Sequence, residues 1–155
     1  MKPYVAVCGA GDATDQDMDR AERVGRLLAE GGAIVLCGGL AGVMDAAARG
    51  ATAAGGLSVG LLPKEERAGA SRHLSVSVPL GMGEARNALL VRAADAVIAI
   101  GGGWGTLSEV ALAMKMGKRV IGLDTWELSR DGESVDGIRR ADSPEEAVRL
   151  TLEPA

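Results

Sequence analysis

The sequence predicts an α/β fold in which helices cover both faces of a mostly parallel β-sheet. Short apolar runs alternate with segments that have helical spacing or an Ala-rich composition. These runs are continuously hydrophobic, which indicates strands buried on both faces of a sheet. The chain has 155 residues and only 2% aromatic residues. We therefore expect one domain, residues 1–155, whose core consists of aliphatic side chains.

Five apolar runs are the expected strands of the sheet. They cover residues 4–8, 34–37, 57–62, 96–100 and 120–123. A further, half-exposed strand is expected where Leu74, Val76 and Val78 alternate with serine. Pro79 has no backbone N–H to donate, so it restricts this strand to a sheet edge or ends it.

Helices are expected between these strands. The first runs from Thr14 or Asp15 to Glu30, because acidic residues at its start suit the helix dipole and two glycines follow it. Three more are expected over residues 43–54, 84–94 and 106–116. The last begins after Ser143, which forms a capping box with Glu146 and is followed by a proline in the first helical position. It extends to about Leu152.

Charge and hydropathy exclude several classes of partner. The 17 basic and 21 acidic side chains give a net charge of −4 without a stripe of Lys and Arg, so nucleic acid is not an expected partner. No run reaches the roughly 18 apolar residues of a membrane helix, and the N-terminus lacks an apolar signal segment. Cys8 and Cys37 lie inside apolar runs, away from metal-ligand spacing. We expect a soluble cytoplasmic protein without a membrane partner, a metal or a bound cofactor.

Glycine-rich turns mark the candidate site. Three of them directly follow expected strands, and in an open parallel sheet the carboxyl ends of the strands line one crevice. Backbone N–H groups in such turns can approach an anion, and a following helix adds about 0.3–1 kcal/mol for negative charge. The spacing fits neither GxGxxG nor a Walker motif. We expect a phosphate cradle that includes Gly9, Gly11, Gly38, Gly39, Gly101, Gly102, Gly103, Gly105 and Thr106.

Two charged residues near these turns are candidate catalytic residues, and each has a structural alternative. Thr106 and Glu109 fit a capping box, but Glu109 can also accept hydrogen bonds from sugar hydroxyls or act as a general base. Arg86 can bridge a phosphate or polarise a leaving base. Alternatively, Arg86 is a surface residue paired with Glu84 or Asp95.

Three segments carry a resemblance to a known family. Residues 101–109 resemble the P-G-G-x-G-T-x-x-E signature of the Lonely Guy (LOG) family, long labelled lysine decarboxylase-like. Arg86 and Asn87, followed by residues 94–96, resemble its R-K…A-D-A element. Residues 38–44 are similar to its G-G-G-x-x-G-L-M turn, so the resemblance extends from residue 4 to about residue 126.

The resemblance implies a Rossmann-like, usually dimeric protein. Enzymes of the family hydrolyse the N-glycosidic bond of nucleoside 5′-monophosphates. By this resemblance Glu109 serves the ribose and the attacking water, and Arg86 assists catalysis. The 5′-phosphate is held by the matching turn, namely Gly102, Gly103, Gly105 and Thr106. Lysine decarboxylation needs pyridoxal phosphate on a Schiff-base lysine, for which the sequence offers no site, and we reject that activity.

Two departures from the LOG pattern point to a different branch. Gly101 replaces the proline of the signature, and Asn87 replaces the lysine beside the arginine. Both changes resemble a sister branch that includes molybdenum-cofactor carrier proteins, and molybdopterin also ends in a phosphate. The prediction is a protein that binds a small phosphorylated ligand, either as a phosphoribohydrolase or as a non-catalytic carrier or nucleotide-sensing module.

Overall fold

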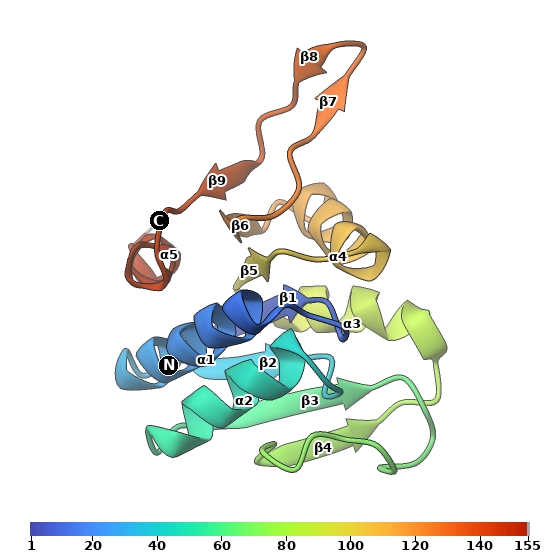
Figure 1. Ribbon diagram of the computed structural model, residues 1–155. Helices are drawn as coiled ribbons and strands as arrows, with labels where there is room; N and C mark the ends of the chain where they lie inside the picture. Colours follow the sequence, from blue (N-terminus) through green and yellow to red (C-terminus); the bar gives the residue numbers. More distant parts are fainter. Residues whose placement is uncertain (155) are drawn as a thin grey trace.

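A parallel sheet of seven strands forms the centre of the molecule, and the computed structural model describes residues 1–154 (Figure 1). In spatial order its strands are β4 (Val76–Pro79), β3 (Ser58–Leu62), β2 (Ile34–Cys37), β1 (Tyr4–Gly9), β5 (Ala96–Ile100), β6 (Arg119–Leu123) and β9 (Ile138–Arg140). Every pairing in this sheet is parallel. All five residues of β5 are buried, as continuous hydrophobicity predicts. The predicted Rossmann-like α/β class is confirmed.

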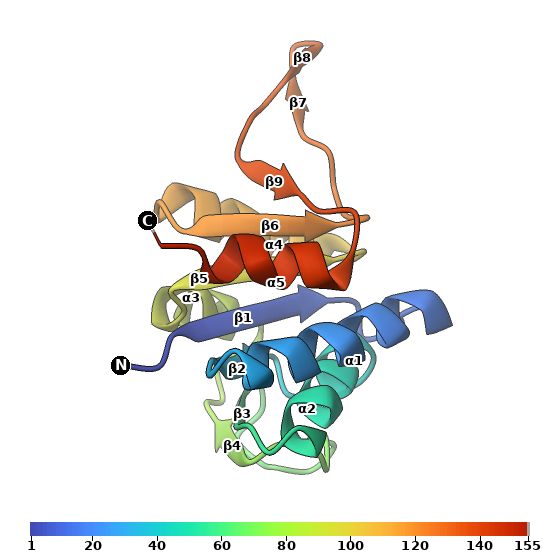
Figure 2. The same ribbon diagram turned by 90° about the vertical axis from the view of Figure 1, so that its left-hand side faces the viewer.

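Helices cover both faces of the sheet (Figures 1 and 2). One face carries α1 (Asp15–Glu30), α2 (Val43–Ala53) and α5 (Pro144–Leu152), and the other carries α3 (Arg86–Ala93) and α4 (Trp104–Lys115). Alternate residues of β1 divide between the two cores. Val5 and Val7 pack on the first face, whereas Ala6 and Cys8 pack on the second.

Helices α1 and α2 pack in direct backbone contact. A Cβ atom at Gly25 would overlap the carbonyl oxygen of Ala47, and one at Gly50 would overlap that of Glu22. Two glycines, one on each helix, therefore permit this close approach. It draws both helices onto the β1 and β2 side of the sheet.

The strand order reverses between β1 and β5. From β1 the chain builds outward through β2, β3 and β4, and then crosses the sheet to β5, β6 and β9. Val5 of β1 pairs with Val35 on one side and Ala96 on the other. Loops that leave neighbouring strands in opposite directions open a crevice at the carboxyl end of β1, the usual position of a ligand in such sheets.

Several predicted element boundaries are confirmed and two are wrong. Strand β4 lies at the sheet edge, as Pro79 predicts, and Thr14 caps α1 by accepting a hydrogen bond from the Asp17 amide (3.1 Å). The helix expected over residues 84–94 is instead a short 3₁₀ helix, η1 (Gly83–Ala85), followed by α3. Helix α4 begins at Trp104, two residues earlier than predicted.

Residues 124–142 contain structure that the apolar pattern does not predict. Strands β7 (Ser129–Arg130) and β8 (Glu133–Ser134) form an antiparallel hairpin that projects from the body of the molecule (Figures 1 and 2). Its turn residues Asp131 and Gly132 both have positive φ angles, 54° and 80°, as a type I′ turn requires. The chain then returns as β9 to the sheet edge.

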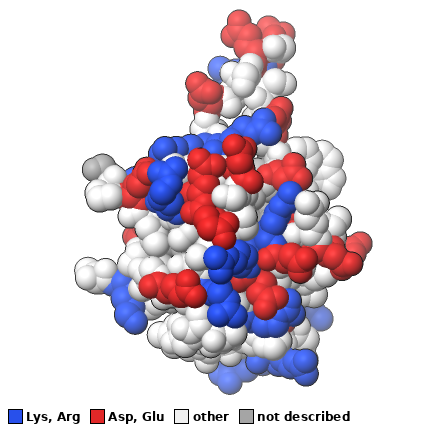
Figure 3. Space-filling model, turned by 60° about the vertical axis from the view of Figure 1, so that its left-hand side comes forward, with Lys and Arg blue, Asp and Glu red and all other residues white. Residues whose placement is uncertain are grey.

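The face that carries α1, α2 and α5 is covered by mixed charges. Figure 3 shows basic and acidic side chains interspersed over it. Several form ion pairs between elements, including Arg23 with Glu145 (2.7 Å) and Arg49 with Glu22 (2.9 Å). This face therefore lacks a continuous basic stripe. Within residues 1–154, no helix has the length and hydrophobicity needed to cross a membrane.

Candidate functional site

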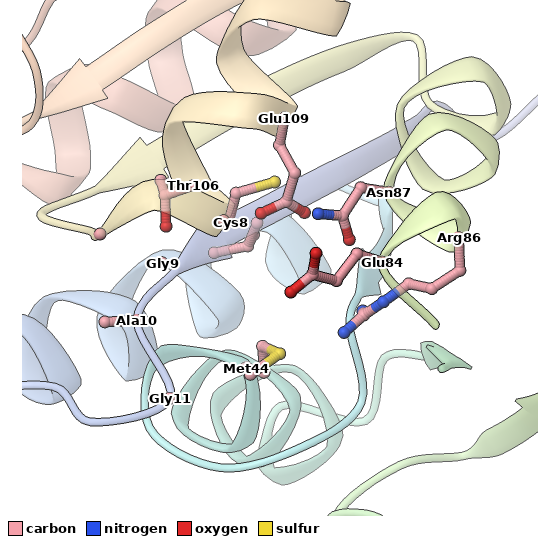
Figure 4. Close-up of a pocket in the computed structure, with 13 residues that line it drawn as sticks. Cys8, Gly9, Ala10, Gly11, Met44, Glu84, Arg86, Asn87, Thr106 and Glu109 are labelled. Atoms are coloured by element: carbon pink, nitrogen blue, oxygen red, sulfur yellow. The ribbon is translucent and has the colours of Figure 1, made fainter. Parts of the chain in front are cut away.

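A cavity of about 310 Å³ lies at the crevice beside the carboxyl end of β1 (Figure 4). It is lined by residues from β1 and its loop, from the start of α2, from η1 and α3, and from the first turns of α4. These residues are Val7, Cys8, Gly9, Ala10, Gly11, Met44, Glu84, Arg86, Asn87, Gly103, Gly105, Thr106 and Glu109. The cavity thus contains both predicted catalytic residues and five of the nine predicted cradle residues.

The loop after β1 forms one wall and packs tightly on the start of α2. The Val43 amide donates to the carbonyl oxygen of Ala10 (3.1 Å), and a Cβ atom at Gly42 would overlap that same oxygen. Gly42 also has a φ of +65°, which favours glycine. A Cβ atom at Gly9 would lie 2.6 Å from the Val43 side chain. Glycine at positions 9 and 42 therefore allows the backbone to line the cavity directly.

The first turn of α4 forms the facing wall. Gly103 is its N-cap and supplies no side-chain hydrogen bond to the helix. The Leu107 amide donates a hydrogen bond to the Gly103 carbonyl oxygen (3.0 Å). The amides that precede Leu107 in the helix have no intrahelical acceptor. Open N–H groups at a helix start form a site for an anion.

The capping-box interpretation of Thr106 and Glu109 is wrong. Thr106 lies inside α4 and is only 3% exposed, so it does not cap the helix. Glu109 lies one turn further along and is 8% exposed. Figure 4 shows the carboxylate of Glu109 directed into the cavity. Both side chains are therefore available to the cavity rather than used by a helix cap.

Residues that follow β6 fix the glycine turn before α4. Thr125 Oγ1 donates to the carbonyl oxygen of Gly101 (2.5 Å), and Trp126 Nε1 donates to that of Gly103 (3.2 Å). The rings of Trp104 and Trp126 lie 5.3 Å apart, with Trp104 79% exposed. This anchoring holds the start of α4 in place beside the cavity.

Within the described residues, Arg86 is a buried cation that forms no ion pair with a carboxylate. It is 8% exposed, and its Nη1 donates to the carbonyl oxygen of Leu61 (3.1 Å). Within residues 1–154 its Nε is buried and has no hydrogen-bond partner. The alternative of a surface arginine paired with Glu84 or Asp95 is therefore wrong. A buried guanidinium with an unused donor favours binding of an external anion.

Burial of Glu109 changes its protonation. Desolvation raises its pKa from the ordinary value of 4.5 to about 7, although the Cys8 thiol, as a hydrogen-bond partner, and the positive charge of Arg86 oppose the increase. Burial likewise raises the pKa of Cys8 well above its usual range. Near neutral pH, Glu109 can therefore both accept and donate a proton.

Four predicted cradle glycines lie outside this cavity. The Gly101 amide donates to the Leu123 carbonyl oxygen (3.0 Å), and Gly101 and Gly102 line a separate hollow beside Trp126. Gly38 lies behind Arg86, where a Cβ atom would overlap the guanidinium. Gly39 packs against Leu62 with a φ of +77°. The other five predicted cradle residues line the cavity.

Sequence reasoning did not assign a site role to several lining side chains. Cys8 is buried, as predicted, but it also lines the cavity, which its position directly before the Gly9 turn indicates. Asn87 connects α3 to α4, because its Nδ2 donates a hydrogen bond to Ser108 Oγ (3.1 Å). Met44, the last residue of the segment that resembles the G-G-G-x-x-G-L-M turn, also lines the cavity, as does Glu84, which no motif marks.

Comparison with known proteins places these features in a family. The model of the SLOG cluster4 family matches residues 2–148. An uncharacterised protein from Archaeoglobus fulgidus is 41% identical over 148 residues, which cover 96% of this chain and 93% of the relative. The similarity includes every element that lines the cavity.

Two solved structures are similar over nearly the whole chain. The molybdenum cofactor binding protein from the phototrophic bacterium Rippkaea orientalis has a TM-score of 0.87 and 36% identity, and the match covers 97% of this chain and 95% of that one. The molybdenum cofactor carrier protein MCP from Chlamydomonas reinhardtii has a TM-score of 0.85 and 32% identity, with 96% of each chain covered.

Proposed function

We propose that this chain, which belongs to the SLOG cluster4 family, binds a small phosphorylated molecule in the cavity beside β1 and carries it without converting it. The observation that carries the proposal is the buried guanidinium of Arg86, whose Nε has no partner within residues 1–154, in a cavity that also contains the uncapped start of α4. A phosphate supplies the acceptor oxygens that both of these groups need.

The energetics favour a dianionic group at this position. A hydrogen bond between charged groups contributes about 1.5–3 kcal/mol, and the N-terminus of a helix adds about 0.3–1 kcal/mol. The glycine loop after β1 admits the ligand close to the backbone because no Cβ atom projects from Gly9 or Gly11. These two contributions sum to about 2–4 kcal/mol, which corresponds to roughly millimolar binding, so tighter binding of a phosphate ester requires further contacts with the rest of the molecule.

The class of cargo that we propose is a phosphorylated pterin, in particular the molybdenum cofactor. The two similar structures described above bind or carry that cofactor, and they match the elements that form the cavity. Its terminal phosphate would lie at Arg86 and the start of α4. The molybdenum and the pterin are cargo here and take no part in a reaction of this chain.

Copurification tests the carrier function. The chain, isolated from its own cell, is expected to contain a stoichiometric phosphorylated pterin detectable by mass spectrometry. Arg86→Ala is expected to lose this compound. Arg92→Ala serves as the matched control, because Arg92 lies on the same helix and is exposed. Equal occupancy of the two variants, or a bound compound without phosphate, contradicts the proposal.

A second candidate function is hydrolysis of a nucleoside 5′-monophosphate. The presence of Glu109 and Arg86 in one cavity favours it, as does the pKa of Glu109 near 7, which suits a general acid or base. A panel of nucleoside 5′-monophosphates distinguishes the two functions. Release of free base that is lost in Glu109→Ala establishes the hydrolase, and absence of release from every compound leaves the carrier.

We also propose that the chain forms a homodimer. Trp104, Met82 and Leu89 are 79%, 48% and 39% exposed, so apolar surface remains on and near the face that carries α3 and α4. Equilibrium sedimentation at micromolar concentration is expected to give twice the mass of one chain. A single species with the mass of one chain contradicts the dimer.

A further inference from the structure

The cavity contains two carboxylates as well as the buried cation. Glu109 enters from α4 at depth, and Glu84 enters from the 3₁₀ helix η1, where it is exposed. Figure 4 shows both carboxylates directed into the same space. Within residues 1–154, neither of them forms an ion pair. The carboxylate of Glu84 is thus available to a bound molecule.

The charges of the cavity favour two different groups on a bound molecule. A phosphate is repelled by the carboxylates and attracted by Arg86 and the open amides at the start of α4. The end of the molecule that meets Glu84 must instead present hydrogen-bond donors, because an ionised carboxylate only accepts them. The site therefore fits a molecule that presents both a phosphate and a donor-rich group.

We propose that Glu84 selects the ring of the ligand by accepting two hydrogen bonds from a 2-amino-4-oxo-pyrimidine. This ring occurs in pterins and in guanine, where a ring N–H and the 2-amino group lie side by side and match the two oxygens of a carboxylate. Hypoxanthine lacks the 2-amino group, and adenine offers an acceptor nitrogen in place of the ring N–H. The inference rests on the proposed function, because it assumes that the phosphate of the same molecule is bound in this cavity.

Glu84 fits this role better than Glu109. Glu84 lies at the exposed rim of the cavity, where a planar ring can reach it, whereas Glu109 is 8% exposed and lies beside Cys8. Burial also raises the pKa of Glu109 to about 7, which reduces its capacity to accept two hydrogen bonds at neutral pH. Glu109 is then available to contact the sugar or linker that joins the ring to the phosphate.

Two pairs of ligands that differ at ring position 2, one member of each with the 2-amino group and the other without it, test the inference. The first pair is guanosine and inosine 5′-monophosphate, and the second is a pterin monophosphate and its 2-oxo lumazine counterpart. By calorimetry at neutral pH, the wild-type chain is expected to bind the amino compound about tenfold or more tightly in at least one pair. The pair with the larger preference identifies the source of the ring.

Glu84→Gln is expected to reduce the preference to about twofold or less, while affinity for the compound without the amino group changes little. Glu66→Gln is the matched control, because Glu66 is exposed and lies outside the cavity lining. Equal affinities within both pairs, or a preference that persists in Glu84→Gln, overturn the inference and leave the phosphate site intact. If none of the four compounds binds, the proposed function fails, and this inference fails with it.

Discussion

Arg86 and Gly38 occupy adjoining space. The Nη1 atom of the guanidinium lies where a Cβ atom at residue 38 would have to be. Gly38 directly follows β2, and Arg86 is the first residue of α3. The absence of a side chain at the end of one strand therefore sets the position of the buried cation that we propose as the phosphate ligand.

Gly38→Ala is expected to displace the guanidinium and weaken binding of a phosphate ester by about tenfold or more, because hydrogen bonds to charged groups depend strongly on geometry. Calorimetric titration with guanosine 5′-monophosphate measures the change. If the effect acts through Arg86, adding Gly38→Ala to Arg86→Ala changes the affinity by about twofold or less. Additive losses in the double variant would show that Gly38 acts independently of Arg86.

The fold was largely predictable because the central strands of the sheet, such as β2 and β5, are buried on both faces. The apolar runs at residues 34–37 and 96–100 match β2 and β5 residue for residue. The start of α4 was predicted wrongly, since Thr106 and Glu109 imitate a capping box while the observed N-cap, Gly103, has no side chain to reveal it. A local sequence pattern does not locate the start of a helix whose N-cap residue has no side chain to bond to the backbone.

The hairpin illustrates a second limit. Asp131 and Gly132 form the dipeptide most typical of a type I′ turn, so a local signal for the hairpin was present. The strands on either side have two residues each and are exposed, so they carry no hydrophobic alternation. The apolar pattern therefore predicts neither the hairpin nor the edge strand β9.

The position of the candidate site could be predicted from the sequence, but the residues that line it could not. Glycine turns after strands indicated the crevice, yet only tertiary packing decides that Gly103 faces the cavity and that the Gly101 amide is used by Leu123. Arg86 looked equally like a surface residue, because the sequence does not reveal that its side chain packs against Gly38 and the Leu61 carbonyl group. Glu84 carries no motif at all.

The raised pKa of Glu109 predicts a pH-dependent cost to folding. Between about 4.5, the ordinary pKa, and about 7 in the folded chain, the folded state binds one more proton than the unfolded state. The free energy of unfolding of the wild type therefore decreases as pH increases through this range. Glu109→Gln removes that decrease. Between pH 4 and pH 8, the free energy of unfolding of the variant therefore increases relative to that of the wild type by an amount on the order of 3 kcal/mol.

Urea unfolding of wild type and Glu109→Gln at several pH values measures this difference. Glu66→Gln, an exposed substitution of the same kind, is expected to follow the wild type at every pH. A stability difference between Glu109→Gln and wild type that is constant with pH would mean that Glu109 titrates normally in the folded chain.

Gly25→Ala is expected to destabilise the chain by about 3 kcal/mol or more, because the new methyl group meets the backbone of Ala47, which cannot move aside as a flexible side chain would. Thermal or urea unfolding measures the loss. Gly105→Ala is the control within another helix, since its Cβ atom meets no atom within 4 Å, and it is expected to retain or gain stability. Equal stability of the two variants would contradict the close packing of α1 on α2.

A crystal structure of the chain with guanosine 5′-monophosphate or a pterin monophosphate tests the central claim most directly. The account predicts that the phosphate lies within hydrogen-bond distance of the Arg86 guanidinium and of amides in the first turn of α4. A phosphate bound at the opposite edge of the sheet, or amides of this turn that contact the protein's own carbonyl groups while ligand occupies another site, would contradict it.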